Sequence, residues 1–358
     1  MQNCANALAA PSARAPIVRP MASTLIVPVT VIDSIVPHPG ADRLEIAQVL
    51  GWQVVVPKGR YQPGASVTYF PPDAIVPKEH SDRFGVTQYL SNGRVKCARL
   101  RGVPSYGFLM PLEVEGAALG DNLAAHYGVT KYEPPIRPFA GDALPDHDWF
   151  PRYTDIENWR NFSDMLIDGE PVVMTEKVHG TNVRVGIVRG ARMAGSHRVR
   201  RAEPTARMNE NPYWLPFTLP EVTALLEHFA KDHERVVLFG ETFGRGVQSF
   251  HYGKKGSLGF AAFDLLVGER YLDWVDLKAS LQRFSVPSVP VLYEGPFSAV
   301  ELKQHAGGKT TFDDQHIREG LVVRPVRERP DVRIGRVVLK YISDDYLLDE
   351  KRSDYTEA

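Results

Sequence analysis

The segment from Glu133 to Pro151 contains five prolines, together with one glycine and several acidic residues. Proline fixes φ and has no backbone N–H, so this density of proline excludes both a helix and an inner strand. The segment therefore predicts an extended linker between two folded units. We expect domains at residues 23–130 and 151–358, a linker at 131–150, and a disordered or leader segment at 1–22.

The first predicted domain has the pattern of a small all-β unit. Short apolar or alternating runs recur between residues 24 and 112, and turn residues such as Pro57-Lys58-Gly59 and Asn92-Gly93 separate them. Roughly six short strands in such a length fit a closed β-barrel such as the OB-fold. We interpret Arg94, Lys96, Arg99 and Arg101 as a basic face for a phosphate backbone. The alternative is the solvated side of an edge strand.

The second predicted domain alternates strands with helices. Apolar residues recur at helical spacing at residues 219–233 and again at 274–284, and strand-like runs lie between and beyond them. This order predicts an α+β domain with mostly antiparallel sheets.

Composition limits the class of protein. The chain has 358 residues, a formal net charge of −1 and only two cysteines, so bulk charge does not indicate nucleic-acid binding and a disulfide framework is excluded. No apolar run approaches the roughly 18–20 residues of a membrane span. We expect a soluble, monomeric, cytoplasmic protein with no membrane contact. Whether residues 1–22 direct it to an organelle stays open.

The sequence Glu176-Lys177-Val178-His179-Gly180-Thr181-Asn182 lies between two apolar runs, at residues 171–174 and 183–188. A lysine at a strand end before a tight glycine turn suits a nucleophile, because a neutral amine attacks well. Its ordinary pKa is near 10.4, so such a site needs burial or a nearby cation. The structural alternative is an exposed strand end followed by a turn glycine.

Other segments follow in a fixed order: Glu241 after an apolar run, Phe263 within a second run, then Glu319-Gly320-Leu321 and Val338-Leu339-Lys340. This ordered set, over about residues 150–345, resembles the covalent nucleotidyltransferases. The lysine segment is most similar to that of RNA ligases. Only eighteen residues follow Lys340, too few for the C-terminal OB domain of DNA ligases and capping enzymes. With a barrel at the N-terminus, the arrangement resembles the Naegleria and Deinococcus type of RNA ligase.

The resemblance implies an ATP-dependent RNA ligase for RNA repair that joins 3′-OH and 5′-phosphate ends, at nicks in RNA-containing duplexes, through a lysyl-AMP intermediate. Lys177 would attack ATP, and Glu319 and Glu241 would hold Mg²⁺ or Mn²⁺. The nucleotide would be bound by Glu176, Gly180, Arg198, Glu241 (at the ribose), Phe263 (at the adenine) and Lys340 (at a phosphate). Asn182 would serve the later sealing steps.

One departure leaves alternatives open. Ligases of this group carry two lysines spaced K-x-K in the last segment, whereas Val338-Leu339-Lys340 supplies one; whether Arg336 replaces the other is open. An RNA- or tRNA-binding protein with a catalytically idle ligase-like domain is one alternative. A ligase that acts mainly on DNA is another.

Overall fold

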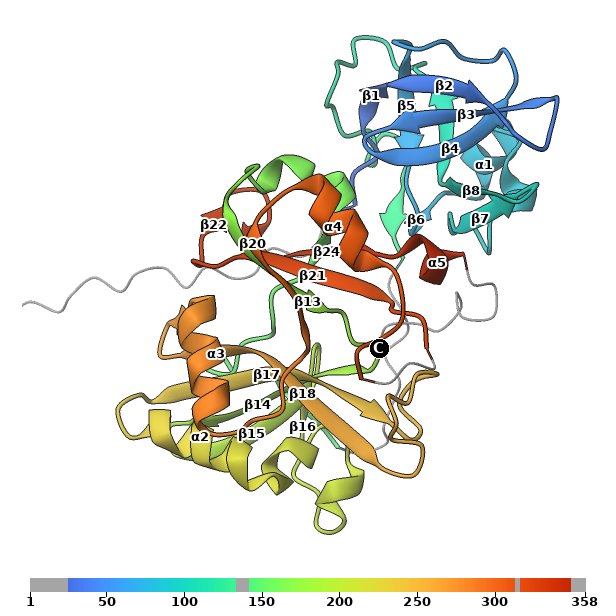
Figure 1. Cartoon of the computed structure of the whole chain (residues 1–358). Coiled ribbons are helices and arrows are strands. Elements are labelled where there is room, and N and C mark those ends of the chain that lie inside the picture. Colours follow the sequence, from blue (N-terminus) through green and yellow to red (C-terminus); the bar gives the residue numbers. More distant parts are fainter. Residues whose placement is uncertain (1–24, 133–141, 313–315, 349–358) are drawn as a thin grey trace, which may run out of the picture.

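The computed structural model describes residues 25–132, 142–312 and 316–348 (Figure 1). A small β-domain stands above two further sheets, a smaller one in the middle and a larger one below, and helices cover the larger sheet (Figure 1). No helix within these described ranges is long and apolar enough to span a membrane.

The N-terminal domain has two antiparallel three-stranded sheets, ordered β1-β5-β9 and β2-β3-β4, which contribute to one core. The elements are β1 Val29–Val31, β2 Ser34–Pro37, β3 Leu44–Val49, β4 Trp52–Pro57, β5 Ser66–Phe70, β6 Ala74–Ile75, α1 Lys78–Arg83, the 3₁₀ turn Thr87–Tyr89, β7 Cys97–Leu100, β8 Val103–Tyr106, β9 Phe108–Pro111 and β10 Thr130–Lys131. The β7–β8 hairpin was not predicted. Its two-residue turn, Arg101-Gly102, has positive φ at both positions, as a hairpin turn of this type requires.

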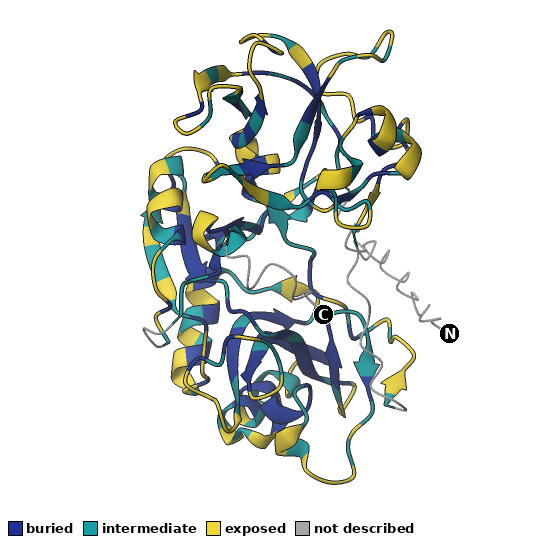
Figure 2. Cartoon of the chain, turned by 90° about the vertical axis from the view of Figure 1, so that its right-hand side faces the viewer, coloured by how far each residue is buried: buried dark blue, intermediate teal, exposed yellow. Residues whose placement is uncertain are grey.

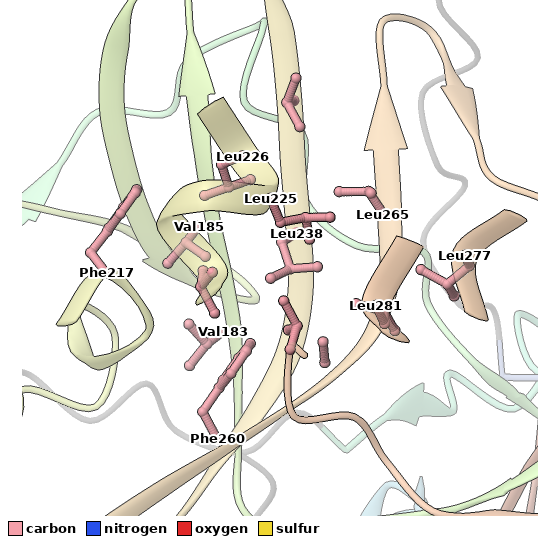
Figure 3. Packing of buried hydrophobic residues seen from close by; sticks show 14 of the residues in the cluster. Val183, Val185, Phe217, Leu225, Leu226, Leu238, Phe260, Leu265, Leu277 and Leu281 are labelled. Atoms are coloured by element: carbon pink, nitrogen blue, oxygen red, sulfur yellow. The ribbon is translucent and has the colours of Figure 1, made fainter. Parts of the chain in front are cut away.

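The larger sheet has seven strands in the order β11-β16-β15-β14-β17-β18-β19, each paired antiparallel with its neighbours. Its elements are β11 Ala143–Leu144, β14 Thr181–Val188, β15 Ala191–Ser196, β16 Arg200–Arg201, β17 Arg235–Gly244, β18 Leu258–Val267 and β19 Arg270–Tyr271. The predicted helices are confirmed as α2 Pro220–Ala230 and α3 Trp274–Arg283. Leu225 and Leu281 from these helices pack with Val185, Leu238 and Leu265 in one core (Figure 3).

Apolar residues on both faces of the larger sheet are buried, which explains why its strands read as continuous apolar runs (Figure 2). On the face away from the helices, Val237 and Phe239 pack with Phe150 and Tyr153. The end of the proline-rich segment and the residues just after it therefore cover the second face of the sheet.

The smaller sheet has the order β12-β24-β21-β13-β20, with β12 and β24 parallel and the other pairs antiparallel. Its elements are β12 Glu157–Asn158, β13 Pro171–Glu176, β20 Val291–Pro296, β21 Gly320–Pro325 and β24 Leu339–Ile342; α4 Ala299–Ala306 packs on it, and the hairpin β22 Pro330–Asp331 and β23 Gly335–Arg336 lies beside it. The remaining elements are the 3₁₀ turns Trp159–Asn161, Ser163–Met165, Met208–Glu210 and Leu215–Thr218, and α5 Asp344–Leu347. Because β13 belongs to the smaller sheet and β14 to the larger one, residues 177–180 pass from one sheet to the other.

Part of the predicted linker packs on the larger sheet. β11 pairs with β16, and the Asp142 carboxylate lies 2.7 Å from the Arg201 guanidinium. Arg184, 1% exposed, donates to the Phe150 carbonyl at 2.6 Å; burial lowers the pKa of Arg184 to about 10. These contacts join residues 142–150 to the second domain. Residues 133–141 of the predicted linker lie outside the described residues, and the predicted domain boundaries stay predictions.

Candidate active site

A cavity of about 520 Å³ lies between the two sheets of the second domain and the N-terminal domain. All nine predicted site residues line it: Glu176, Lys177, Gly180, Asn182, Arg198, Glu241, Phe263, Glu319 and Lys340. They come from β13, β14, β17, β18, β24 and the segments between strands, so the fold brings together what the sequence spreads over more than 160 positions.

Lys177 and Glu319 form the central pair of the cavity. The Lys177 Nζ donates to the Glu319 Oε1 at 2.6 Å, and the two side chains are 16% and 3% exposed. The Lys177 backbone N–H donates to the Gly320 carbonyl at 3.0 Å, which fixes the lysine beside the start of β21. An ammonium has no lone pair, so the predicted attack by Lys177 would first require the loss of a proton.

Two tyrosines that the sequence analysis did not select hold the turn after Lys177. The Tyr252 hydroxyl oxygen accepts the His179 backbone N–H at 2.7 Å, and the Tyr346 hydroxyl lies 3.2 Å from His179 Nδ1. The same Nδ1 is 3.3 Å from Glu319 Oε2. Burial, and then the charge of Glu319, raise the pKa of Tyr252 well above its ordinary value, so its hydroxyl stays neutral. His179 is thus a packed part of the turn, held through its backbone N–H and its ring.

Gly180 is required by close approach to β17. A Cβ on this residue would lie 2.3 Å from the Thr242 carbonyl oxygen and 2.9 Å from Glu241 Cγ. The Gly180 N–H donates to Glu241 Oε1 at 3.2 Å. The glycine therefore lets the Lys177 turn pack directly on the strand that carries Glu241.

The Glu176 carboxylate has a task that the sequence did not predict. It is 1% exposed, accepts from the Thr311 N–H at 2.9 Å and from its hydroxyl at 2.7 Å, and also bonds with the Thr310 hydroxyl. The Arg318 guanidinium lies 3.7 Å away. Glu176 thus ties the segment before β21 to the Lys177 turn, and a nucleotide contact by its side chain stays a prediction.

The remaining predicted residues form the walls of the cavity. Asn182 is directly opposite Glu241 in the β14–β17 pairing, and its buried Oδ1 has no hydrogen-bond partner among the described residues. Phe263 is half-buried against Tyr153, with ring centroids 4.9 Å apart. A buried acceptor without a partner indicates a place for a ligand donor.

Arg336 does not replace the missing lysine of the last segment. Its guanidinium donates to Asp264 at 2.8 Å and to Glu328 at 2.7 Å, and it lies 3.5 Å from the centroid of the Tyr271 ring. It is not among the residues that line the cavity, whereas Val338 is. At the position of the first expected lysine, the cavity therefore has an apolar side chain.

The N-terminal domain forms one wall of the cavity. Some residues of the predicted basic face line this wall, and others lie outside it. Arg94, Lys96 and Lys131 line the cavity, and Arg94 bonds with Asp73 at 2.7 Å. Arg99, by contrast, is outside the cavity and donates to the Gly102 carbonyl at 3.1 Å within its own hairpin turn. Only the first part of the predicted face therefore faces the site.

Arg160 joins the two domains. Its guanidinium lies 4.5 Å from the ring centroids of Trp52 and Tyr341 and pairs with Asp344 at 2.7 Å. Tyr106 donates to the same Asp344 at 2.8 Å. Asp344 begins α5, which also holds Tyr346, so the contact between the domains continues to the Lys177 turn.

The carboxylates of the cavity fit a metal ion that arrives with a phosphate ligand. Within the described ranges, no group of three or more His, Cys, Asp or Glu residues could hold an ion by itself. Glu319 and Glu241 both line the cavity, and Mg²⁺ is commonly bound through one or two carboxylates, water and substrate phosphates. The oxygen donors present match that pattern.

Comparison with known proteins gives a consistent result. Residues 170–342 match the family model described as RNA ligase, and residues 26–112 match a model described as an OB-fold domain. A variant of the Naegleria gruberi RNA ligase with AMP and Mn is 25% identical, with a TM-score of 0.75 over 92% of this chain and 99% of that chain. The same ligase with PPi is 25% identical, with a TM-score of 0.74 over 92% and 98%. The comparison with curated proteins found no match.

Proposed function

Through residues 170–342 this chain belongs to the RNA ligase family, with an OB-fold domain at its N-terminus, and on that premise we propose that it seals 3′-OH and 5′-phosphate ends of RNA, at nicks in duplexes. One observation carries the proposal. A lysine, Lys177, is enclosed in a cavity beside a buried carboxylate and opposite residues suited to bind a nucleotide.

The proposed reaction has three steps. The Lys177 amine forms a P–N bond with the α-phosphorus of ATP while the bond to the leaving pyrophosphate breaks. The RNA 5′-phosphate then takes the AMP, which restores the lysine amine. The 3′-hydroxyl finally attacks the 5′-phosphorus, forms the phosphodiester and releases AMP. Each step needs charge stabilisation on phosphate oxygens and in-line placement of the groups.

The residues of the cavity divide these tasks. Glu319 holds the Lys177 ammonium until the nucleotide arrives, and Arg198 and Lys340 bind phosphate oxygens. Phe263 stacks on adenine, Glu241 binds the ribose, and Asn182 serves the later steps. Glu319 and Glu241 would hold a divalent ion. Such an ion, Mg²⁺ or Mn²⁺, neutralises phosphate charge and favours the neutral form of a nearby amine. Relatives of similar structure were solved with ATP or AMP and Mn.

Intact mass spectrometry after incubation with ATP and Mg²⁺ tests the covalent step. The wild type should gain the mass of one AMP, and Lys177→Ala should gain none. Lys303→Ala, which removes an exposed lysine of α4, is the matched control and should behave as the wild type. An adduct that persists in Lys177→Ala would place the nucleophile elsewhere.

A second candidate function is an RNA-binding protein with an idle ligase domain, favoured by Val338 in place of the expected lysine. The absence of any adduct in the wild type, over a range of metal ions and pH, would support this candidate. Sealing of matched RNA and DNA nicks by the active protein would decide the strand preference.

A further inference from the structure

We infer that the β17–β18 loop, residues 245–257, is a docking surface for the sugar–phosphate backbone of the RNA strand outside the cavity. The loop joins two strands of the larger sheet whose residues include Glu241 and Phe263. Its sequence contains Arg245, Lys254 and Lys255 and no acidic residue. The inference rests on the proposed RNA-joining function.

The loop is held at the rim of the cavity by two buried aromatic side chains. Phe250, 0% exposed, packs with its ring centroid 5.0 Å from that of His179 and stacks on His316 at 4.8 Å. Tyr252 binds the His179 backbone N–H, and Gln248 lines the cavity. These contacts fix the backbone of the loop directly beside the Lys177 turn. The backbone atoms that carry its exposed side chains therefore have a defined position.

The three cations of the loop differ from the arginines buried in the fold. Arg245, Lys254 and Lys255 are exposed and form no ion pair with any residue in the described part of the chain. Arg184, Arg324 and other buried arginines, in contrast, are paired with carboxylates. In a chain with a net charge of −1, this loop is a local positive surface that can attract a polyanion.

The position and chemistry of this surface favour a nucleic-acid strand over other partners. The three cations do not line the cavity, so they would meet a strand that extends out of it rather than a nucleotide bound inside. The large apolar side chains of the loop, Phe250 and Tyr252, are buried, whereas protein interfaces need exposed aromatic or apolar residues at their centre. Contacts by lysine and arginine alone position a phosphate backbone without reading its sequence.

The test compares the double variant Lys254→Gln/Lys255→Gln with the wild type and with Lys231→Gln/Lys303→Gln. The control pair removes the same charge from exposed positions at α2 and α4. Binding of a fluorescent nicked RNA duplex is measured by anisotropy between 50 and 300 mM salt. AMP adduct formation is measured in parallel and should be unchanged in every variant, because no substituted residue lines the cavity.

Each lost phosphate contact should reduce the magnitude of the slope of log affinity against log salt concentration by about 0.7–0.9. The slope of the double variant should therefore be smaller in magnitude by about 1.4–1.8. Its affinity near 0.1 M salt should fall at least about tenfold, and the control should match the wild type. Arg245→Gln, at the other end of the loop, should reduce the slope by about 0.7–0.9. The inference would be overturned if the wild type, the double variant and Arg245→Gln had equal slopes. It would also be overturned if the control pair lost as much affinity and slope as the double variant. If the wild type formed no adduct, the proposed function would fail while the binding test still decided the role of the loop.

Discussion

Replacement of Asp264 by asparagine should destabilise the second domain strongly. Asp264 is fully buried and accepts from Arg336 at 2.8 Å and from the Tyr153 hydroxyl at 2.8 Å, and it pairs with Arg324 at 3.1 Å. Asp264→Asn keeps the shape of the side chain but removes its charge. The buried guanidinium of Arg324 and the partly buried one of Arg336 would then share one remaining carboxylate, that of Glu328.

The expected loss of stability in Asp264→Asn follows from this arrangement. Removal of one partner from a buried ion pair costs about 3–5 kcal/mol. Glu328 still pairs with Arg336 at 2.7 Å and with Arg324 at 3.3 Å, so the lower end, about 3 kcal/mol, is expected. For a domain of this size, the midpoint of thermal unfolding should fall by about 6–12 °C. Circular dichroism during heating measures it.

Asp164→Asn is the matched control, because Asp164 pairs with Arg333 at 2.8 Å while its side chain is 64% exposed. Its midpoint should stay within about 2 °C of the wild type. A similarly small change in Asp264→Asn would refute the argument that the buried carboxylate stabilises the arginine cluster.

The difference between wild type and Asp264→Asn should also depend on pH. Burial alone would raise the pKa of Asp264, but the guanidiniums of Arg336 and Arg324 hold that pKa below its ordinary value. A carboxyl with a lowered pKa in the folded state stabilises fully above its unfolded value of about 3.9 and loses this contribution below it. The gap in midpoint should therefore be constant above about pH 5 and shrink towards pH 3; a gap that widened would contradict this assignment.

Three further substitutions test the surroundings of the cavity. Tyr346→Phe removes the hydroxyl beside His179 Nδ1 and should slow AMP adduct formation about five- to tenfold in rapid-quench assays, with unchanged thermal stability; an unchanged rate would exclude a positioning role. Arg160→Lys keeps a positive charge near Asp344 but loses the planar stack on aromatic rings, so the unfolding midpoint should fall by about 2–6 °C, whereas an unchanged midpoint would mean that the stack adds little. Phe263→Leu should raise the KM for ATP about fivefold with little change in kcat, and an equal KM would argue against adenine stacking at this ring.

The sequence determined the elements whose signals are local. Strands with continuous apolar runs, such as β14 and β17, and helices with apolar residues at helical spacing, such as α2, could be predicted because neighbouring residues decide them. The order of the site segments also selected nine residues, all of which are among those that line the cavity. That selection came from the resemblance of the ordered segments to a known family, because the residue types alone left a structural alternative for the lysine segment.

Only the tertiary structure decided which side chains line the cavity and which form ion pairs or hydrogen bonds outside it. Arg336 and Arg198 are both arginines near a site segment, but the first pairs with Asp264 and the second lines the cavity. Tyr252 and Tyr346 have no local signal, because their partner, His179, is 73 and 167 positions away. The central pair of Lys177 and Glu319 is itself separated by 142 positions. Contacts over such distances depend on how the two sheets pack, which no local pattern of residues encodes.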